Sequence, residues 1–264
     1  MLGVVTSHLT GAASRVYSAL AYLAFAVSAT WAIAFLADLR TVPVIDDTPS
    51  GPAWLAVLVD SGLLLVFALQ HSVMARAGVK RRMARVVPAA IERSTYVLST
   101  SLCLGLMFWQ WRGLPASIWL VDAQPWVALL WAICALGWVI ALGSTFMIDH
   151  LDFLGLRQGG WARRGPDSSP SFAERWMYAW LRHPMMLGLL VAFWATPSMT
   201  AGHLLFAVAA SGYIAVGVRF EERDLRGQLG DVYGEYARRV PRFLPRPPRS
   251  VPAALPTETN AGRS

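Results

Sequence analysis

The chain has 264 residues, of which 55% are hydrophobic and only 15% are charged; average globular chains carry about 25% charged residues. Its formal net charge is nevertheless +7, from 23 basic and 16 acidic residues. Because the hydrophobic residues occur in long runs, this composition excludes a soluble nucleic-acid-binding protein, a disordered chain and a secreted disulfide scaffold. It indicates an all-α polytopic membrane protein whose basic residues lie outside the lipid.

Four apolar runs have the length of membrane spans, since a crossing helix needs about 20 mostly apolar residues. They cover residues 17–37, 53–70, 95–111 and 126–148. Two further runs follow, over 185–195 and 204–220, and Pro197 lies between them, where it ends a helix. We expect these two runs to form a C-terminal helical hairpin, which gives about six transmembrane helices.

The charges of the loops predict the orientation, because basic loops stay on the cytoplasmic side. The loops after the second and fourth spans and the C-terminal segment are rich in arginine, whereas the loops after the first and third spans are not. The basic loops share one side only if the number of crossings is even. We therefore expect six crossings with both termini cytoplasmic. The abundance of alanine, glycine and arginine favours a bacterial inner membrane.

The domain organisation follows from where the apolar sequence ends. Proline and small polar residues dominate the last part of the chain, and such a segment cannot form a core. We expect one integral-membrane domain over 1–245, ending in a short amphipathic cytoplasmic segment, and a disordered proline-rich tail over 246–264. Cys103 and Cys134 lie in apolar runs, so the sequence predicts neither a disulfide nor a metal site. Gly137 and Gly143 indicate close helix packing only.

Polar residues crowd the predicted cytoplasmic ends of the spans in three places, and polar groups at membrane depth are functional candidates because they are costly to bury. The first place is the Gln70-His71-Ser72 run, and the second is the Asp149-His150-Leu151-Asp152 run. The third joins LRHPMMLG at 181–188 to the adjacent carboxylates Glu221 and Glu222. Helix capping and ion pairing explain these residues as readily as catalysis does, so both interpretations stay open here.

The third place carries a recognisable pattern. RHP at 182–184, Gly188, the glutamate pair, L-G-x-x-Y-x-x-Y at 229–236 and V-P-R-x-x-P at 240–245 together resemble the isoprenylcysteine carboxyl methyltransferase superfamily. The segments FALQHSVMAR at 67–76, ERSTYVL at 92–98, IDHLDFLGLRQ at 148–158 and FWATPSMTAGHLLF at 193–206 resemble the nurim family more narrowly. Within that family they resemble its bacterial branch, the methanethiol S-methyltransferases.

The resemblance implies a membrane enzyme that uses S-adenosyl-L-methionine to methylate methanethiol, a small thiol, to dimethyl sulfide. In the wider superfamily the cofactor pocket lies on the cytoplasmic side. Carried over to this chain, the resemblance implies a cofactor-binding set of Arg182, His183, Pro184, Leu187, Gly188, Glu221, Glu222, Tyr233, Tyr236 and Arg239. Gly217 stands where the prenylcysteine enzymes have an arginine for the substrate carboxylate, which fits a substrate without one.

Methylation of a thiol requires a thiolate, so a base is expected. We hypothesise that His71 or His150 is this base, oriented by Asp149 or Asp152, and that Glu221 anchors the cofactor. Two alternatives stay open: a methyltransferase for hydrogen sulfide, another small thiol or a lipid-like acceptor, and a non-enzymatic nurim-like scaffold in the membrane. No nucleic-acid partner is expected. A transporter is disfavoured because no span shows a charged residue near its middle.

Overall fold

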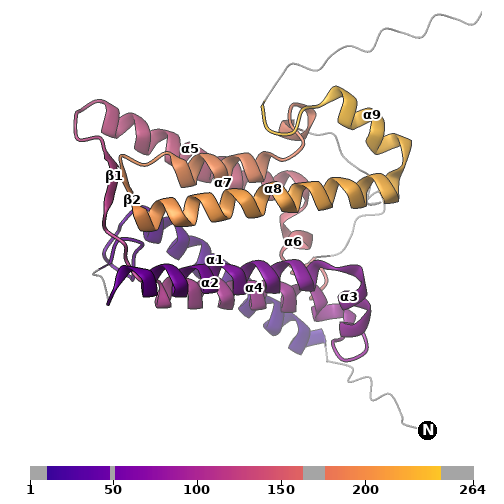
Figure 1. The fold of residues 1–264 in the computed structure, drawn as a ribbon. Coiled ribbons are helices and arrows are strands. Elements are labelled where there is room, and N and C mark those ends of the chain that lie inside the picture. Colours follow the sequence, from indigo (N-terminus) through magenta and orange to yellow (C-terminus); the bar gives the residue numbers. More distant parts are fainter. Residues whose placement is uncertain (1–10, 48–50, 163–175, 245–264) are drawn as a thin grey trace, which may run out of the picture.

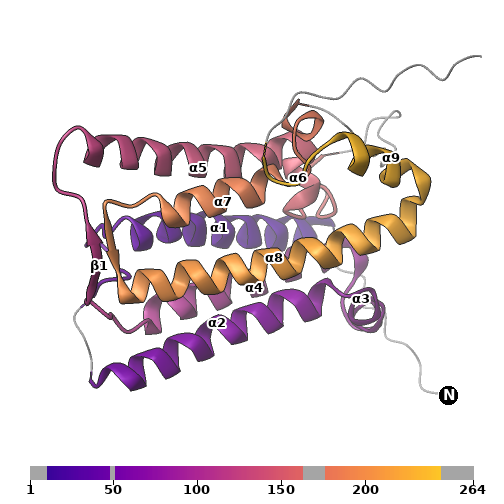
Figure 2. The ribbon, with the colours of Figure 1, turned by 45° about the horizontal axis from the view of Figure 1, so that its top comes forward.

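The long apolar runs of the sequence form helices that lie side by side in one bundle (Figures 1 and 2). The computed structural model describes residues 11–47, 51–162 and 176–244, which are mostly helical. The predicted tail over 246–264 lies outside these residues. In chain order the elements are α1 (Gly11–Leu36), α2 (Ala53–Ala75), α3 (Ala77–Met83), η1 (Ala89–Ile91), α4 (Glu92–Gln110), β1 (Ser117–Leu120), α5 (Trp126–Ile148), α6 (His150–Phe153), η2 (Trp176–Ala179), α7 (Pro184–Trp194), β2 (Ser198–Thr200), α8 (Ala201–Leu229) and α9 (Asp231–Arg239).

Within the described ranges, four helices are long and apolar enough to cross a membrane: α1, α2, α5 and α8. They have 23 to 29 residues, and 20 helical residues span about 30 Å. Helix α4 matches the predicted range 95–111 but is not among the four, because serines and threonines interrupt its apolar sequence. Helix α7 has only 11 residues. The predicted membrane protein is therefore confirmed, and the count of six crossings stays a prediction.

Consecutive helices of the bundle run in opposite directions, so the connections gather at two ends (Figure 2). Helices α3, α6 and α9 lie at one end, which we call the α9 end; β1 and β2 pair antiparallel at the other, the sheet end. At the sheet end Thr200 caps α8 by accepting from the backbone N–H of His203, and its hydroxyl donates to Asp46. Burial raises the pKa of the Asp46 carboxyl, and the Thr200 bond opposes that rise.

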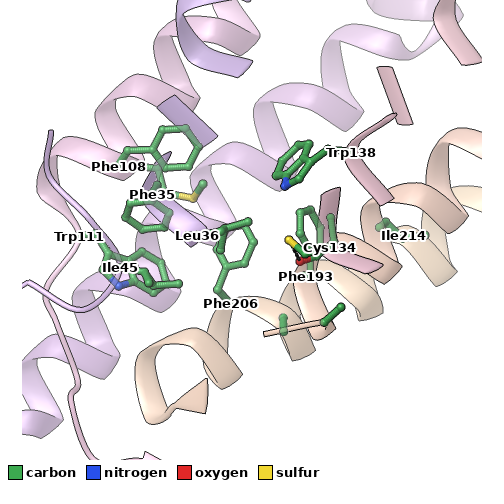
Figure 3. Packing of buried hydrophobic residues seen from close by; sticks show 14 of the residues in the cluster. Phe35, Leu36, Ile45, Phe108, Trp111, Cys134, Trp138, Phe193, Phe206 and Ile214 are labelled. Carbon is green, nitrogen blue, oxygen red and sulfur yellow. Dashed lines mark hydrogen bonds between the residues drawn. The ribbon is translucent and has the colours of Figure 1, made fainter. Parts of the chain in front are cut away.

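Aromatic side chains from five helices fill the interior of the bundle near the sheet end (Figure 3). Phe35 of α1 packs against Phe108 of α4 in a tilted arrangement with 4.7 Å between ring centroids, and Phe193 of α7 meets Phe206 of α8 edge-on at 5.2 Å. Trp138 adds a ring from α5. Because each ring belongs to a different helix, this cluster fixes the lateral order of the bundle.

Helices α5 and α7 touch backbone to backbone. A Cβ added at Gly137 would lie 2.6 Å from the Ala192 nitrogen and 2.7 Å from the Gly188 oxygen, and one added at Gly188 would lie 2.5 Å from the Ala141 nitrogen. Small residues at such contacts let two helices approach at main-chain distance. The prediction of close packing is confirmed for Gly137 and is wrong for Gly143, where an added Cβ meets nothing within 4 Å.

One charged residue lies inside a predicted span, contrary to the expectation from the sequence. Asp60 is in α2 and is fully buried, and its Oδ1 accepts the backbone N–H of Arg112 at 3.0 Å. Arg112 follows the C-terminus of α4, so Asp60 ties α2 to the end of α4. A backbone donor beyond a helix end satisfies one oxygen of this side chain, a structural use that apolar run lengths do not reveal.

The α5–α7 contact predicts opposite effects of two alanine substitutions. Gly137→Ala should lower the free energy of unfolding by about 1–3 kcal/mol, because overpacking forces the two backbones apart. Gly143→Ala has open space for its methyl group and should gain up to about 1 kcal/mol from helix propensity. Thermal unfolding of both variants in detergent, followed by circular dichroism, checks this. Equal midpoints would contradict the contact.

Candidate active site

The segments that carry the predicted site residues meet at the α9 end, where α2, α5 and α8 end and α7 begins (Figures 1 and 2). Their contacts divide them into three groups: one around Glu222, one around His71 and one around His150. The two histidines have different hydrogen-bond partners, Tyr96 and Thr100 for His71 and Tyr22 and Thr145 for His150, so each has its own surroundings.

The first group is built on a fully buried carboxylate. Glu222 of α8 accepts from Arg182 at 2.8 Å, from Arg242 at 2.8 Å and from His183 Nε2 at 3.2 Å. Arg226, one helical turn later, adds a contact at 3.5 Å. Burying a carboxylate is costly unless it is paired and hydrogen-bonded, and these donors meet that requirement. The charge–charge contact also raises the pKa of the Arg242 guanidinium.

The same group joins three segments that are far apart in the sequence. The backbone N–H groups of Arg182 and His183 donate to the carbonyls of Pro241 and Arg242, at 2.9 and 3.2 Å. The RHP segment, the end of α8 and the chain after α9 are therefore one unit. Arg182 and Glu222 are engaged within it, which gives both a structural role; their predicted part in cofactor binding stays a prediction.

Glu221 differs from its neighbour because successive helical residues point about 100° apart. Its side chain is 52% exposed, and its carboxylate lies 3.6 Å from His183 Nδ1. Burial, and to a lesser extent the Glu221 charge, raises the pKa of the Tyr178 phenol in η2 to about 12. Tyr178 is therefore a protonated hydrogen-bond donor at neutral pH, next to a carboxylate with acceptor capacity.

Helix α9 forms a platform over this unit. Tyr233 and Tyr236 are buried and pack against each other and against Val240. The Tyr236 hydroxyl donates to the backbone carbonyl of Tyr178 at 2.7 Å, which holds η2 against α9. Burial raises the pKa of the Tyr233 phenol. Arg239 lies half-buried in the last turn of α9.

The predicted pocket residues of α7 have defined places as well. Pro184 is the first residue of α7, where a proline fits because that N–H would have no helical partner. Gly188 packs on α5, and Leu187 is half-buried. The structure thus shows a packing role for Gly188, and a role in binding remains a prediction for all three.

The second group surrounds His71 where α2, α4 and α8 meet. The Tyr96 hydroxyl lies 2.9 Å from His71 Nε2 and 3.1 Å from Nδ1, and Thr100 Oγ1 lies 3.3 Å from Nδ1. The imidazole stacks on Phe67 with 5.5 Å between centroids. The hydroxyl of Ser72, next to His71 in the chain, forms a hydrogen bond of 3.1 Å with the Tyr213 hydroxyl of α8. The group therefore extends onto the helix that carries the glutamate pair.

The third group surrounds His150 in the short helix α6. Thr145 Oγ1 lies 2.8 Å from His150 Nδ1, and the Tyr22 hydroxyl of α1 lies 3.2 Å from Nε2. Burial lowers the pKa of the His150 imidazole, and the nearby Asp149 charge opposes this. His150 is therefore neutral at neutral pH, as a base must be.

The two aspartates beside His150 serve the turn that carries it. Asp149 accepts the backbone N–H of Asp152 at 3.0 Å and pairs with Arg157 at 2.7 Å. Asp152 lines a cavity of about 280 Å³ together with Arg157, Gln158 and Ala162. Asp149 is therefore engaged by the turn itself, and the orienting role expected for one of these two carboxylates stays a prediction.

Arg93 of α4 connects the second and third groups. Its guanidinium lies 5.2 Å from the Tyr96 ring centroid and 5.0 Å from that of Phe153, and its Nε donates to the Phe153 carbonyl at 2.7 Å. The segments ERSTYVL and IDHLDFLGLRQ, which carry the nurim resemblance, therefore pack on each other.

Sequence reasoning missed the hydroxyl partners of both histidines and Arg242. Tyr96 and Arg242 lie inside the recognised segments, so those segments offered a signal for them. Tyr22 and Thr145 lie outside, and apolar runs gave no reason to select them. In the part of the chain that the structure describes, no group of histidine, cysteine, aspartate and glutamate side chains could hold a metal ion.

The fold and these polar groups define a multi-helix membrane protein with a candidate site at one membrane edge. The model of a family described as NnrU protein matches residues 61–221. A protein of Mycobacterium tuberculosis (strain ATCC 25618 / H37Rv) named methanethiol S-methyltransferase is 52% identical to this chain. The match covers 89% of this chain and 96% of the length of that protein. A protein of the same name from Pseudomonas sp. (strain GM41(2012)) is 44% identical, over 89% of this chain and 90% of that protein. Nurim of Xenopus laevis is 33% identical, over 65% of this chain and 64% of that protein. No solved structure matches the chain.

The chain therefore belongs to the NnrU protein family, and its resemblance to the methanethiol S-methyltransferases and, more distantly, to nurim is confirmed. The names of the relatives support a methyltransferase function.

The Glu222 group predicts a large loss of stability when its charge is removed. Glu222→Gln should lower the free energy of unfolding by about 3–5 kcal/mol, because it leaves Arg182 buried without its counter-charge. Glu235→Gln is the matched control: its pair with Arg238 is 3.8 Å long and exposed, so its loss should cost less than about 1 kcal/mol. Thermal unfolding of both variants in detergent measures the difference. Similar midpoints would show that the buried charge is dispensable.

Proposed function

We propose that this protein transfers a methyl group from S-adenosylmethionine to methanethiol and releases dimethyl sulfide. The observation that carries the proposal is the pair of unequal carboxylates at the α9 end: Glu222 is neutralised by buried partners, while Glu221 is half exposed. The imidazoles of His71 and His150 lie at the same end of the bundle. The names of the relatives supply the acceptor and the type of reaction.

The residues present fit a cationic donor. Glu221 has an exposed carboxylate that can accept from an ammonium or a ribose hydroxyl, and Tyr178 is a protonated phenol near it. S-adenosylmethionine, when bound, supplies a methyl group already activated by a sulfonium. The unit of α7, α8 and α9 would hold this molecule, with Glu221 as its anchor and His183 orienting Glu221.

The chain's own part in the reaction is to generate and place the nucleophile. Methanethiol is a weak acid, so a neutral imidazole that takes its proton raises the fraction of thiolate. His71 and His150 are the candidate bases, each held by a tyrosine hydroxyl. Alignment of thiolate, methyl and leaving sulfur supplies the rest of the rate acceleration.

We also propose six crossings with the α9 end cytoplasmic. Helices α4 and α7 lie along the other four, and α7 supplies about 16 Å, half of a bilayer core. Ala195, Thr196 and Pro197 continue from it without helical structure and are buried, as irregular backbone at membrane depth must be. Lys80, Arg81 and Arg82 of α3 and the arginines of α9 lie at the α9 end, as the positive-inside rule requires. In a bacterium this membrane would be the inner one.

The acceptor and the donor are tested together by headspace gas chromatography. Cells that express the chain and receive methanethiol and methyl-labelled methionine should release labelled dimethyl sulfide. Replacing the base should cost about 10²-fold or more, so at least one of His71→Ala and His150→Ala should lose activity to that extent. Near-normal turnover in both variants would contradict a histidine base. Labelled methanethiol from sulfide, or no volatile product, would point instead to another acceptor or to a scaffold.

The anchoring role of Glu221 is tested by calorimetry with S-adenosylmethionine in detergent. Glu221→Gln should weaken binding about 10- to 100-fold, because a hydrogen bond to a charged group contributes about 1.5–3 kcal/mol. Stability should change little, since the side chain is half exposed. Glu235→Gln, at an exposed site on α9, serves as control. Unchanged affinity in Glu221→Gln would refute the anchoring role.

A further inference from the structure

The hydrogen bonds around His150 determine which of its nitrogens carries the proton. Thr145 Oγ1 lies 2.7 Å from the Leu142 carbonyl oxygen and 2.8 Å from His150 Nδ1. A carbonyl only accepts, so the single hydroxyl hydrogen of Thr145 points at Leu142. Thr145 must then accept from His150, which places the imidazole hydrogen on Nδ1.

The other nitrogen of His150 is consequently the basic one. In a neutral imidazole with Nδ1–H, Nε2 carries the lone pair. The Tyr22 hydroxyl, 3.2 Å away, donates to it. This is a long hydrogen bond for an O–H donor, so an incoming donor can take its place. Phe146 stacks on the imidazole at 3.9 Å and keeps the ring plane fixed.

The charged groups near His150 are already matched to other partners. Asp149 is bound to Arg157 and to the backbone of α6, and Arg93 is bound to the carbonyl of Phe153. Tyr22 faces the imidazole from α1, and Thr145 and Phe146 face it from α5. Uncharged hydroxyls, rather than a carboxylate, therefore contact both nitrogens.

The surroundings of His71 do not impose one tautomer in this way. Both of its nitrogens lie within 3.1 Å of the same Tyr96 hydroxyl, and Thr100 faces Nδ1 at 3.3 Å. A single phenol hydroxyl near both nitrogens does not select one tautomer over the other. His150 has a separate partner for each nitrogen.

We propose that His150 is the base that takes the thiol proton, through Nε2, and that Thr145 and Tyr22 are positioning residues that hold it in the Nδ1–H tautomer. This inference rests on the proposed function. The thiol S–H bond breaks and its proton moves to Nε2. The thiolate sulfur forms a bond to the methyl carbon, and the bond from that carbon to the donor sulfonium breaks with its electron pair left on the donor. The imidazolium then returns its proton to water.

The two positioning residues should shift the pH dependence in opposite directions. Thr145 accepts from Nδ1–H, a bond that is stronger when the ring is charged, so Thr145→Val lowers the pKa of His150 and moves the acid limb of kcat/KM to lower pH. Tyr22 donates to the lone pair of the neutral ring, so Tyr22→Phe raises that pKa and moves the limb to higher pH. Each shift should be about 0.5–1 in pH, the worth of one hydrogen bond.

The experiment measures dimethyl sulfide formation by the full-length protein in detergent as a function of pH. Opposite shifts in Thr145→Val and Tyr22→Phe support the proposal, and Thr145→Ser should restore the wild-type limb. Tyr17→Phe is the control, because it removes a similar phenol contact, to Thr95, on the same helix α1. Unmoved limbs, or limbs that move together, would overturn the proposal.

A second measurement does not depend on activity. Nitrogen-15 spectra of histidine-labelled protein, with the His150 signals assigned by their loss in His150→Ala, should show a protonated Nδ1 and an unprotonated Nε2. Thr145→Val should populate the other tautomer. A protonated Nε2 in the wild type would overturn the inference even if the enzyme makes dimethyl sulfide. If the wild type makes no dimethyl sulfide, the proposed function fails, and so does the role of His150 as base for the thiol. The spectra still report the tautomer of His150 in that case.

Discussion

A single buried carboxylate organises the α9 end of this protein. Glu222 has no exposed surface, and a charge in that position is tolerable only while Arg182, His183 and Arg242 surround it. These partners come from the start of α7 and from the chain after α9. The carboxylate therefore selects one arrangement of three segments, and that arrangement leaves the adjacent Glu221 facing outward as the acceptor that the proposed donor needs.

The two histidine groups share one design, in which hydroxyls replace carboxylates as partners of the imidazole. A carboxylate beside a histidine stabilises its charged form and would keep it protonated at a membrane edge where desolvation already disfavours charge. Tyrosine and threonine orient the ring without adding charge. This keeps the imidazole neutral and basic, which suits a substrate that must give up a proton from a weakly acidic thiol.

The sequence predicted the bounds of a helix well where an uninterrupted apolar run defines that helix, and poorly where charged residues continue it. The range 126–148 agrees with α5 because Pro125 and Asp149 bound an uninterrupted apolar run. Helix α8 extends to Leu229, beyond the predicted end at 220, because its last turns are charged and invisible to hydropathy. Two adjacent glutamates look equivalent in a sequence, and only the helical rotation separates the buried one from the exposed one. The contact between Tyr22 and His150 joins residues 128 positions apart, which no local pattern reveals.

The backbone contact between α5 and α7 also limits how the site can move. With Gly137 and Gly188 at main-chain distance, the contact holds no long side chain whose rotamer could change, so we expect the two helices to move together. Thr145 lies in the last turn of α5, His150 follows that helix and His183 precedes α7, so the α5–α7 contact sets the separation between the proposed base and the proposed donor-binding unit. Any opening that admits substrates must then come from elements outside this pair.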